Sequence, residues 1–145
     1  MCYDSGVMPK SQPFSIRLSA LTDELVTQEA RRTRRSKGAV IEMLTDEALR
    51  TRRFPGLAFR GSDWNRRPWV IGTALDVWEI VAASRRFASP QEMAAKTDLS
   101  EPHIRLALAY YEGSPEEIDE AIRESETPLA RLQRDFPTID TVTAD

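Results

Sequence analysis

Apolar and polar residues alternate strictly over residues 14–19. Successive side chains of a β-strand point to opposite sides, so this alternation predicts a strand with one buried face. The apolar positions of the strand are Phe14, Ile16 and Leu18. No neighbouring strand accompanies it in the pattern, which leaves its backbone N–H and C=O groups without partners in the same chain.

Two amphipathic helices are predicted after the strand, one over about residues 21–32 and one from Ser36, a good N-cap residue, to the proline after Phe54. Their apolar residues recur three and four positions apart. They are Leu21, Leu25 and Val26 in the first helix and Val40, Ile41, Leu44 and Ala48 in the second. Roughly 40 residues make too small a core to stand alone, so we expect a homodimer in which a second copy pairs strand with strand.

A paired ribbon of this kind has one exposed face, which carries two copies of Ser15 and Arg17. A two-stranded ribbon fits the major groove of DNA, where arginine binds guanine with two hydrogen bonds. Ser36, Lys37 and Gly38 start the second helix with backbone N–H groups and a cation that suit a phosphate. The pattern predicts a DNA-binding unit. The alternative is that the basic residues before Ser36 form an ordinary solvated helix end.

A β-hairpin and several short helices are predicted beyond residue 54. The hairpin joins residues 57–60 to 69–71, and the helices cover about residues 74–86, 91–96, 101–111 and 115–123. The second and third of these helices, with the tight turn between them, have the outline of a helix-turn-helix. This segment is acidic, which opposes phosphate binding, so we favour a structural or dimer-forming role for it.

The charges are distributed unevenly along the chain. The net charge is −3, from 20 basic and 23 acidic residues. Up to Gly72 there are 13 basic and 8 acidic residues (+5), and beyond it 7 basic and 15 acidic residues (−8). The asymmetry suggests one end that binds nucleic acid and another that binds a different partner; the alternative is a chance fluctuation.

The chain offers few residues for catalysis. Cys2 is the single cysteine, which excludes an internal disulfide and a multi-cysteine zinc site. The one histidine, His103, lies at the start of a predicted helix, and no glycine-rich phosphate loop, paired-histidine helix or serine elbow is present. We expect a protein that is not an enzyme and uses no cofactor or metal. No apolar run approaches the roughly 20 residues that span a membrane, and residues 1–12, a predicted disordered start, lack a signal core, so we expect a cytoplasmic protein.

Residues 14–19, the Arg-Arg-Ser-Lys-Gly turn at 34–38 and the Val40-Ile41-x-x-Leu44 pattern resemble a ribbon-helix-helix repressor. The resemblance covers a bit under a third of the chain. It implies that the outward strand residues read bases, although the proline among them offers no side-chain hydrogen bond. The candidate DNA-binding residues are Pro13, Ser15, Arg17, Arg35, Ser36, Lys37 and Gly38.

The middle of the chain is similar to a second family. The stretches FPGLAFRG, RPWVIGTALDVWEIV and LALAYYEGSPEEIDEAI are similar, in this order, to the small helical domain of unknown function 433. A ribbon-helix-helix arm joined to such a domain looks like a VapB-type antitoxin. This resemblance implies a PIN-domain ribonuclease toxin as the partner.

The tail from Pro128 carries apolar residues at spacings of three and four. On a chain end they make poor core material and suit the groove of a partner. Arg131 and Arg134 could also enter an acidic metal site of a toxin and block it. The candidate toxin-binding residues are Leu129, Arg131, Leu132, Arg134, Phe136 and Ile139. The alternative is that the tail folds back on its own domain.

These observations predict a mainly α protein: a ribbon-helix-helix unit over 13–54, a small β-hairpin plus helical, helix-turn-helix-like domain over 55–125, and a partner-binding tail over 126–145. The expected function is that of an antitoxin in a type II toxin-antitoxin system, which neutralises a PIN-type ribonuclease and represses its own operon as a dimer on operator DNA. The alternative is a stand-alone ribbon-helix-helix repressor without a toxin partner.

Overall fold

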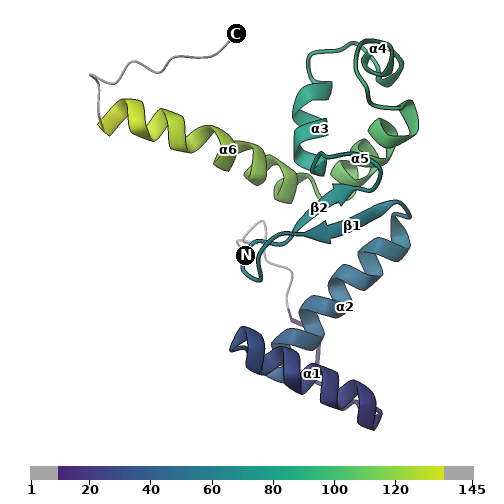
Figure 1. Cartoon of the computed structure of the whole chain (residues 1–145), viewed down its shortest axis with the longest axis vertical. Coiled ribbons are helices and arrows are strands. Elements are labelled where there is room, and N and C mark those ends of the chain that lie inside the picture. Colours follow the sequence, from purple (N-terminus) through teal and green to yellow (C-terminus); the bar gives the residue numbers. More distant parts are fainter. Residues whose placement is uncertain (1–9, 136–145) are drawn as a thin grey trace, which may run out of the picture. The chain divides into compact units, whose positions relative to one another are not determined.

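The computed structural model describes residues 10–135, with side chains up to Glu126. This part of the chain is mostly helical, with six helices and one small two-stranded antiparallel sheet (Figure 1). The mainly α character predicted from the sequence is confirmed. The chain forms two compact units that divide after Glu42, within helix α2.

The N-terminal unit contains helix α1, Ala20–Thr33, and the first part of α2, Lys37–Arg53. Ser19 caps α1, since its side-chain oxygen accepts a hydrogen bond from the N–H of Thr22 at 3.2 Å. The core of the unit is small. Its buried residues are Val26, Ala30 and Val40, with Leu18 and Ile41 packed against them.

The strand predicted over residues 14–19 does not form in the single chain, where this segment has no regular secondary structure. Phe14 is 81% exposed and Ile16 62% exposed. The expectation that Leu21 and Leu25 face inward is also wrong for the single chain, since they are 67% and 55% exposed. The physical reason is that a lone strand has no hydrogen-bonding partner and a three-residue core cannot cover these side chains.

The sheet belongs to the second unit and consists of β1, Leu57–Arg60, and β2, Arg67–Val70. Leu57 pairs with Val70, and Arg60 with Arg67. Gly61 follows β1 with a φ of 114°, and a Cβ at this position would lie 2.1 Å from the carbonyl oxygen of Asn65. Only glycine fits there, which explains why a glycine follows β1 at the point where the chain turns.

Four helices follow the sheet in the second unit: α3, Val77–Ser84; α4, Pro90–Lys96; α5, Glu101–Gly113; and α6, Pro115–Asp135. Helices α3 and α5 contact strand β2. Ser89 and Ser100 cap α4 and α5 with their side-chain oxygens, as the sequence predicts. Helix α3 is shorter than predicted because Asp76 caps it. Helix α6 is longer than predicted, since its backbone stays helical beyond residue 123 to Asp135.

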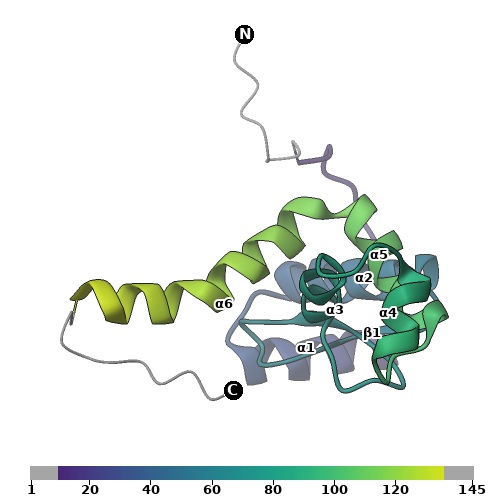
Figure 2. The same cartoon turned by 90° about the horizontal axis from the view of Figure 1, so that it is seen from above.

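The core of the second unit joins the sheet to helices α3, α4, α5 and α6. Its fully buried side chains include Leu57, Val70, Val77, Ile80, Met93, Ile104, Tyr110 and Ile118. Ile122 is the last buried residue of α6 among the described side chains. Beyond it the helix projects away from α3 and α5 (Figure 1, Figure 2). No helix within residues 10–135 is both long and apolar enough to cross a membrane.

Asp76 joins the sheet to α3. Its carboxylate is 6% exposed and accepts hydrogen bonds from the Nε atoms of Arg60 at 2.7 Å and Arg67 at 2.8 Å. Its backbone N–H donates to the side chain of Glu79 at 2.7 Å. Arg60 also donates to the carbonyl of Ala74 at 2.8 Å. One buried carboxylate therefore fixes both strands and the start of α3.

A second polar cluster joins α2, α5 and α6 within the same unit. The Arg50 guanidinium donates to the Tyr110 hydroxyl and to the Glu117 carboxylate, both at 2.7 Å, and the hydroxyl donates to the same carboxylate at 2.8 Å. Burial and the neighbouring Glu117 raise the pKa of the Tyr110 phenol well above its ordinary value. The phenol is thus a permanent hydrogen-bond donor near neutral pH.

Replacing Asp76 by asparagine should destabilise the second unit by about 2–4 kcal/mol, because it leaves two arginines facing a neutral group in a partly buried site. Urea unfolding followed by tryptophan fluorescence measures the change as a lower midpoint. Asp98→Asn, at an exposed position before α5, is the control and should leave the midpoint unchanged. Equal midpoints for Asp76→Asn and the wild type would contradict the role given to Asp76.

Candidate nucleic-acid interface

The turn between α1 and α2 holds the candidate phosphate-binding residues in a defined backbone geometry. Arg34 ends α1 in the left-handed conformation, with a φ of 55°. The N–H of Arg35 donates to the carbonyl of Ala30 at 3.0 Å, which satisfies one of the last carbonyls of α1. The Ser36 side chain then accepts from the N–H of Ala39 at 3.1 Å and caps α2. The cap predicted at Ser36 is confirmed.

The start of α2 is open to a ligand. A side chain at Gly38 would meet no atom within 4 Å, so the backbone of the first turn is accessible from outside. Helix N-termini carry a partial positive charge and free N–H groups that attract anions. The first turn of α2 contains no acidic residue, which leaves that charge in place.

Lys37 forms an ion pair with Asp23 of α1. The side chains are 47% and 51% exposed. Pairs this exposed contribute only about 0.2–1 kcal/mol, so a phosphate that also receives hydrogen bonds from the helix N-terminus can displace Asp23. Without a ligand, the ion pair with Asp23 holds the Lys37 side chain beside the turn.

Arg34 belongs to the basic turn at 34–38 but is not among the candidate DNA-binding residues from the sequence. Only glycine adopts the left-handed conformation without strain, and asparagine replaces it most readily. An arginine at this position therefore destabilises the turn and places a cation on it. The sequence signal that could have identified this position is the absence of a glycine at the end of helix α1, where the left-handed conformation favours one.

The three strand residues of the candidate interface lie in the irregular segment before α1. Pro13, Ser15 and Arg17 are all exposed there. An ion pair of 3.4 Å between Lys10 and Glu42 lies at the start of this segment, with both side chains mostly in solvent. The single chain thus exposes these three residues without arranging them as a ribbon.

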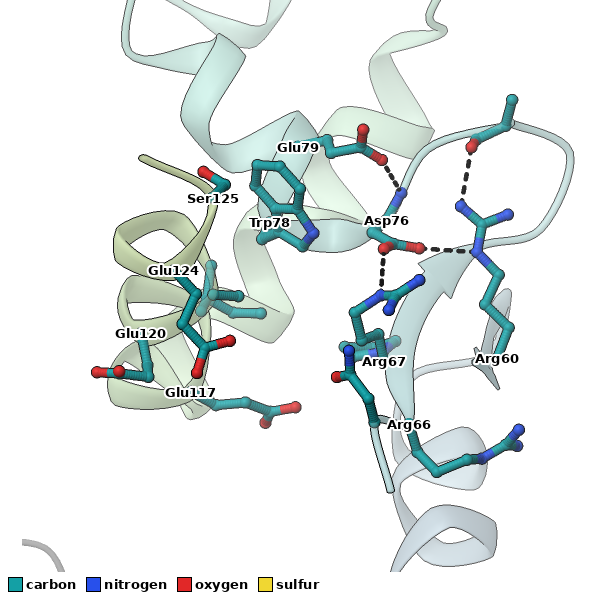
Figure 3. Close-up of a pocket in the computed structure, with 15 residues that line it drawn as sticks. Arg60, Arg66, Arg67, Asp76, Trp78, Glu79, Glu117, Glu120, Glu124 and Ser125 are labelled. Carbon is teal, nitrogen blue, oxygen red and sulfur yellow. Dashed lines mark hydrogen bonds and ion pairs between the residues drawn. The ribbon is translucent and has the colours of Figure 1, made fainter. Parts of the chain in front are cut away.

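Arg66, in the loop between β1 and β2, and Arg67, the first residue of β2, are engaged inside the second unit. Arg66 donates to both carboxylate oxygens of Glu47, at 2.8 Å and 3.2 Å, and Arg67 binds Asp76 (Figure 3). These contacts use the cationic groups of both arginines. They indicate a structural role for both arginines.

The candidate toxin-binding residues fall in and beyond the end of α6. The backbone is helical at Leu129, Arg131, Leu132 and Arg134, whereas Phe136 and Ile139 lie outside the described residues.

Within residues 10–135, no group of three or more histidine, cysteine, aspartate or glutamate side chains is arranged to hold a metal ion.

Comparisons with family models, curated proteins and solved structures returned no match for this chain.

Proposed function

We propose that the protein is the antitoxin of a type II toxin-antitoxin system. Its N-terminal unit forms a homodimer that binds operator DNA, and its C-terminal helix binds and inhibits a PIN-type ribonuclease toxin. The observation that carries the proposal is the set of large apolar side chains that the N-terminal unit leaves exposed around a core of three buried residues.

A second copy of the chain is the occupant that fits this apolar surface. Phe14, Ile16, Leu21 and Leu25 are each more than half exposed. Full burial of a side chain of this size gains about 1.5–3 kcal/mol, so eight of them in a dimer gain up to about 12–24 kcal/mol. Association costs about 4–15 kcal/mol, which the gain offsets. Pairing residues 14–19 of two copies also satisfies the backbone of a segment that has no partner strand in the described chain.

DNA is the ligand that fits the polar side of such a dimer. Strand pairing would bring two copies of Arg17 onto one exposed ribbon, where arginine can read guanine in the major groove. Two copies of the turn with Arg34 and Lys37 would then face the phosphates with two helix N-termini. Base contacts and phosphate contacts thus come from separate elements of the same unit.

A protein partner fits the projecting end of α6. The helix extends to Asp135 although the last buried residue among its described side chains is Ile122. A helix that leaves its own core is suited to the groove of another protein. Together with the resemblance of the middle segment to the domain of unknown function 433, this supports a toxin as the partner.

The wild-type protein should sediment as a dimer in analytical ultracentrifugation. Leu25→Glu should give a monomer, because two buried carboxylates without partners would oppose association. Ile71→Glu is the matched control, since Ile71 is 49% exposed in the second unit, and this variant should remain dimeric. A dimeric Leu25→Glu variant, or a monomeric wild type, would refute the proposed dimer.

Arg17→Ala should weaken binding to the DNA upstream of the protein's own gene by about 1–3 kcal/mol and leave non-specific binding almost unchanged. Fluorescence anisotropy at fixed salt, with the specific and a scrambled duplex, measures both affinities. Arg86→Ala, at an exposed position of the second unit, is the control. The ribbon assignment fails if Arg17→Ala binds the specific duplex as tightly as the wild type.

Truncation after Ser125 should abolish neutralisation of the toxin and spare dimerisation and operator binding, because it removes the projecting half of α6. The assay is growth of cells that co-express the small nuclease recovered with the tagged protein from its host. Full neutralisation by the truncated chain would rule out the tail as the inhibitor. Recovery of the protein with DNA alone would favour a stand-alone repressor instead.

A further inference from the structure

The cap of α2 leaves backbone donors unused at the start of the helix. The Ser36 side chain accepts from the N–H of Ala39, and the Ser36 carbonyl accepts from the N–H of Val40. The N–H groups of Lys37 and Gly38 have no acceptor within residues 10–135. Together with the Lys37 ammonium, these groups are the donors that the proposed DNA contact uses at this turn.

Asp23, in the first turn of α1, supplies an anion for Lys37 in the single chain. Its carboxylate forms an ion pair with the Lys37 ammonium. The position suits a carboxylate, because the partial positive charge at the start of α1 also attracts it. The two side chains are each about half exposed, so a ligand can reach the pair from solvent.

This ion pair opposes the phosphate contact of Lys37. The ammonium has to leave Asp23 before it neutralises a phosphate, and a carboxylate that stays beside the phosphate repels it. The first turn of α2 itself contains no acidic residue. The opposing charge therefore comes from α1, through one side chain that can be replaced without touching α2.

We propose that Asp23 is an autoinhibitory residue that weakens the contact between α2 and DNA phosphates. The inference rests on the proposed operator binding and concerns the regulation of that same site. Phosphate contacts carry no sequence information, so the carboxylate weakens binding to every duplex by the same factor. The base contacts of Arg17 stay as they are, and DNA that lacks the bases read by Arg17 is released more readily.

The test is fluorescence anisotropy of the full-length protein at fixed salt, with the duplex from upstream of its own gene and with a scrambled duplex. Asp23→Asn should bind both duplexes more tightly than the wild type. An exposed ion pair shifts an equilibrium by about 1.4-fold to fivefold, so two copies in a dimer give about twofold to 25-fold. Asp23→Ser should have the same effect, since it also removes the carboxylate.

Glu24→Gln is the matched control. It removes the same charge from the next residue, which is exposed and whose side chain accepts a hydrogen bond from Gln28. Its gain in affinity should stay below that of Asp23→Asn. In a Lys37→Gln background the two acid variants should have equal effects, a result that a purely structural role of Asp23 does not produce.

Three outcomes overturn the inference and leave operator binding intact. They are equal affinities of Asp23→Asn and Glu24→Gln, weaker binding by Asp23→Asn than by the wild type, and a gain confined to the operator duplex. A wild type that binds neither duplex overturns the proposed function together with the inference.

Discussion

The second unit depends on one buried carboxylate. Asp76 accepts hydrogen bonds from an arginine of each strand and starts α3 through its backbone. A two-stranded sheet is marginal on its own, so the contact between sheet and helix supplies stability that four residues per strand cannot. The same carboxylate neutralises Arg60 and Arg67. The link between the sheet and α3 therefore depends on a single charge.

The N-terminal unit has more large apolar side chains than its small core can cover. Val26, Ala30 and Val40 are buried, while four larger apolar side chains remain in solvent. In the proposed dimer, a second copy would cover these side chains and pair the segment before α1. Folding and association of this unit would then be a single process, with its stability depending on protein concentration.

Local signals in the sequence predicted the local structure well. Ser36, Ser89 and Ser100 cap helices where the patterns place them, because capping involves residues only three apart. The strand predicted at 14–19 does not form in the single chain, because the described residues offer no strand that could pair with it. The ion pairs of Asp76 with Arg60 and Arg67 were not foreseen either, since the sequence separations are 16 and 9 residues and the three side chains meet only in the fold. The candidate DNA-binding turn could be predicted because its residues are contiguous in the sequence. The left-handed conformation of Arg34 could not be predicted.

The hydrogen bonds among Arg50, Tyr110 and Glu117 have a consequence for the pH dependence of stability. A phenol whose folded-state pKa is raised contributes stability that is fully present below its ordinary pKa of about 10 and is lost only as pH rises through the folded value. The phenol therefore holds α2, α5 and α6 together equally well across the neutral range.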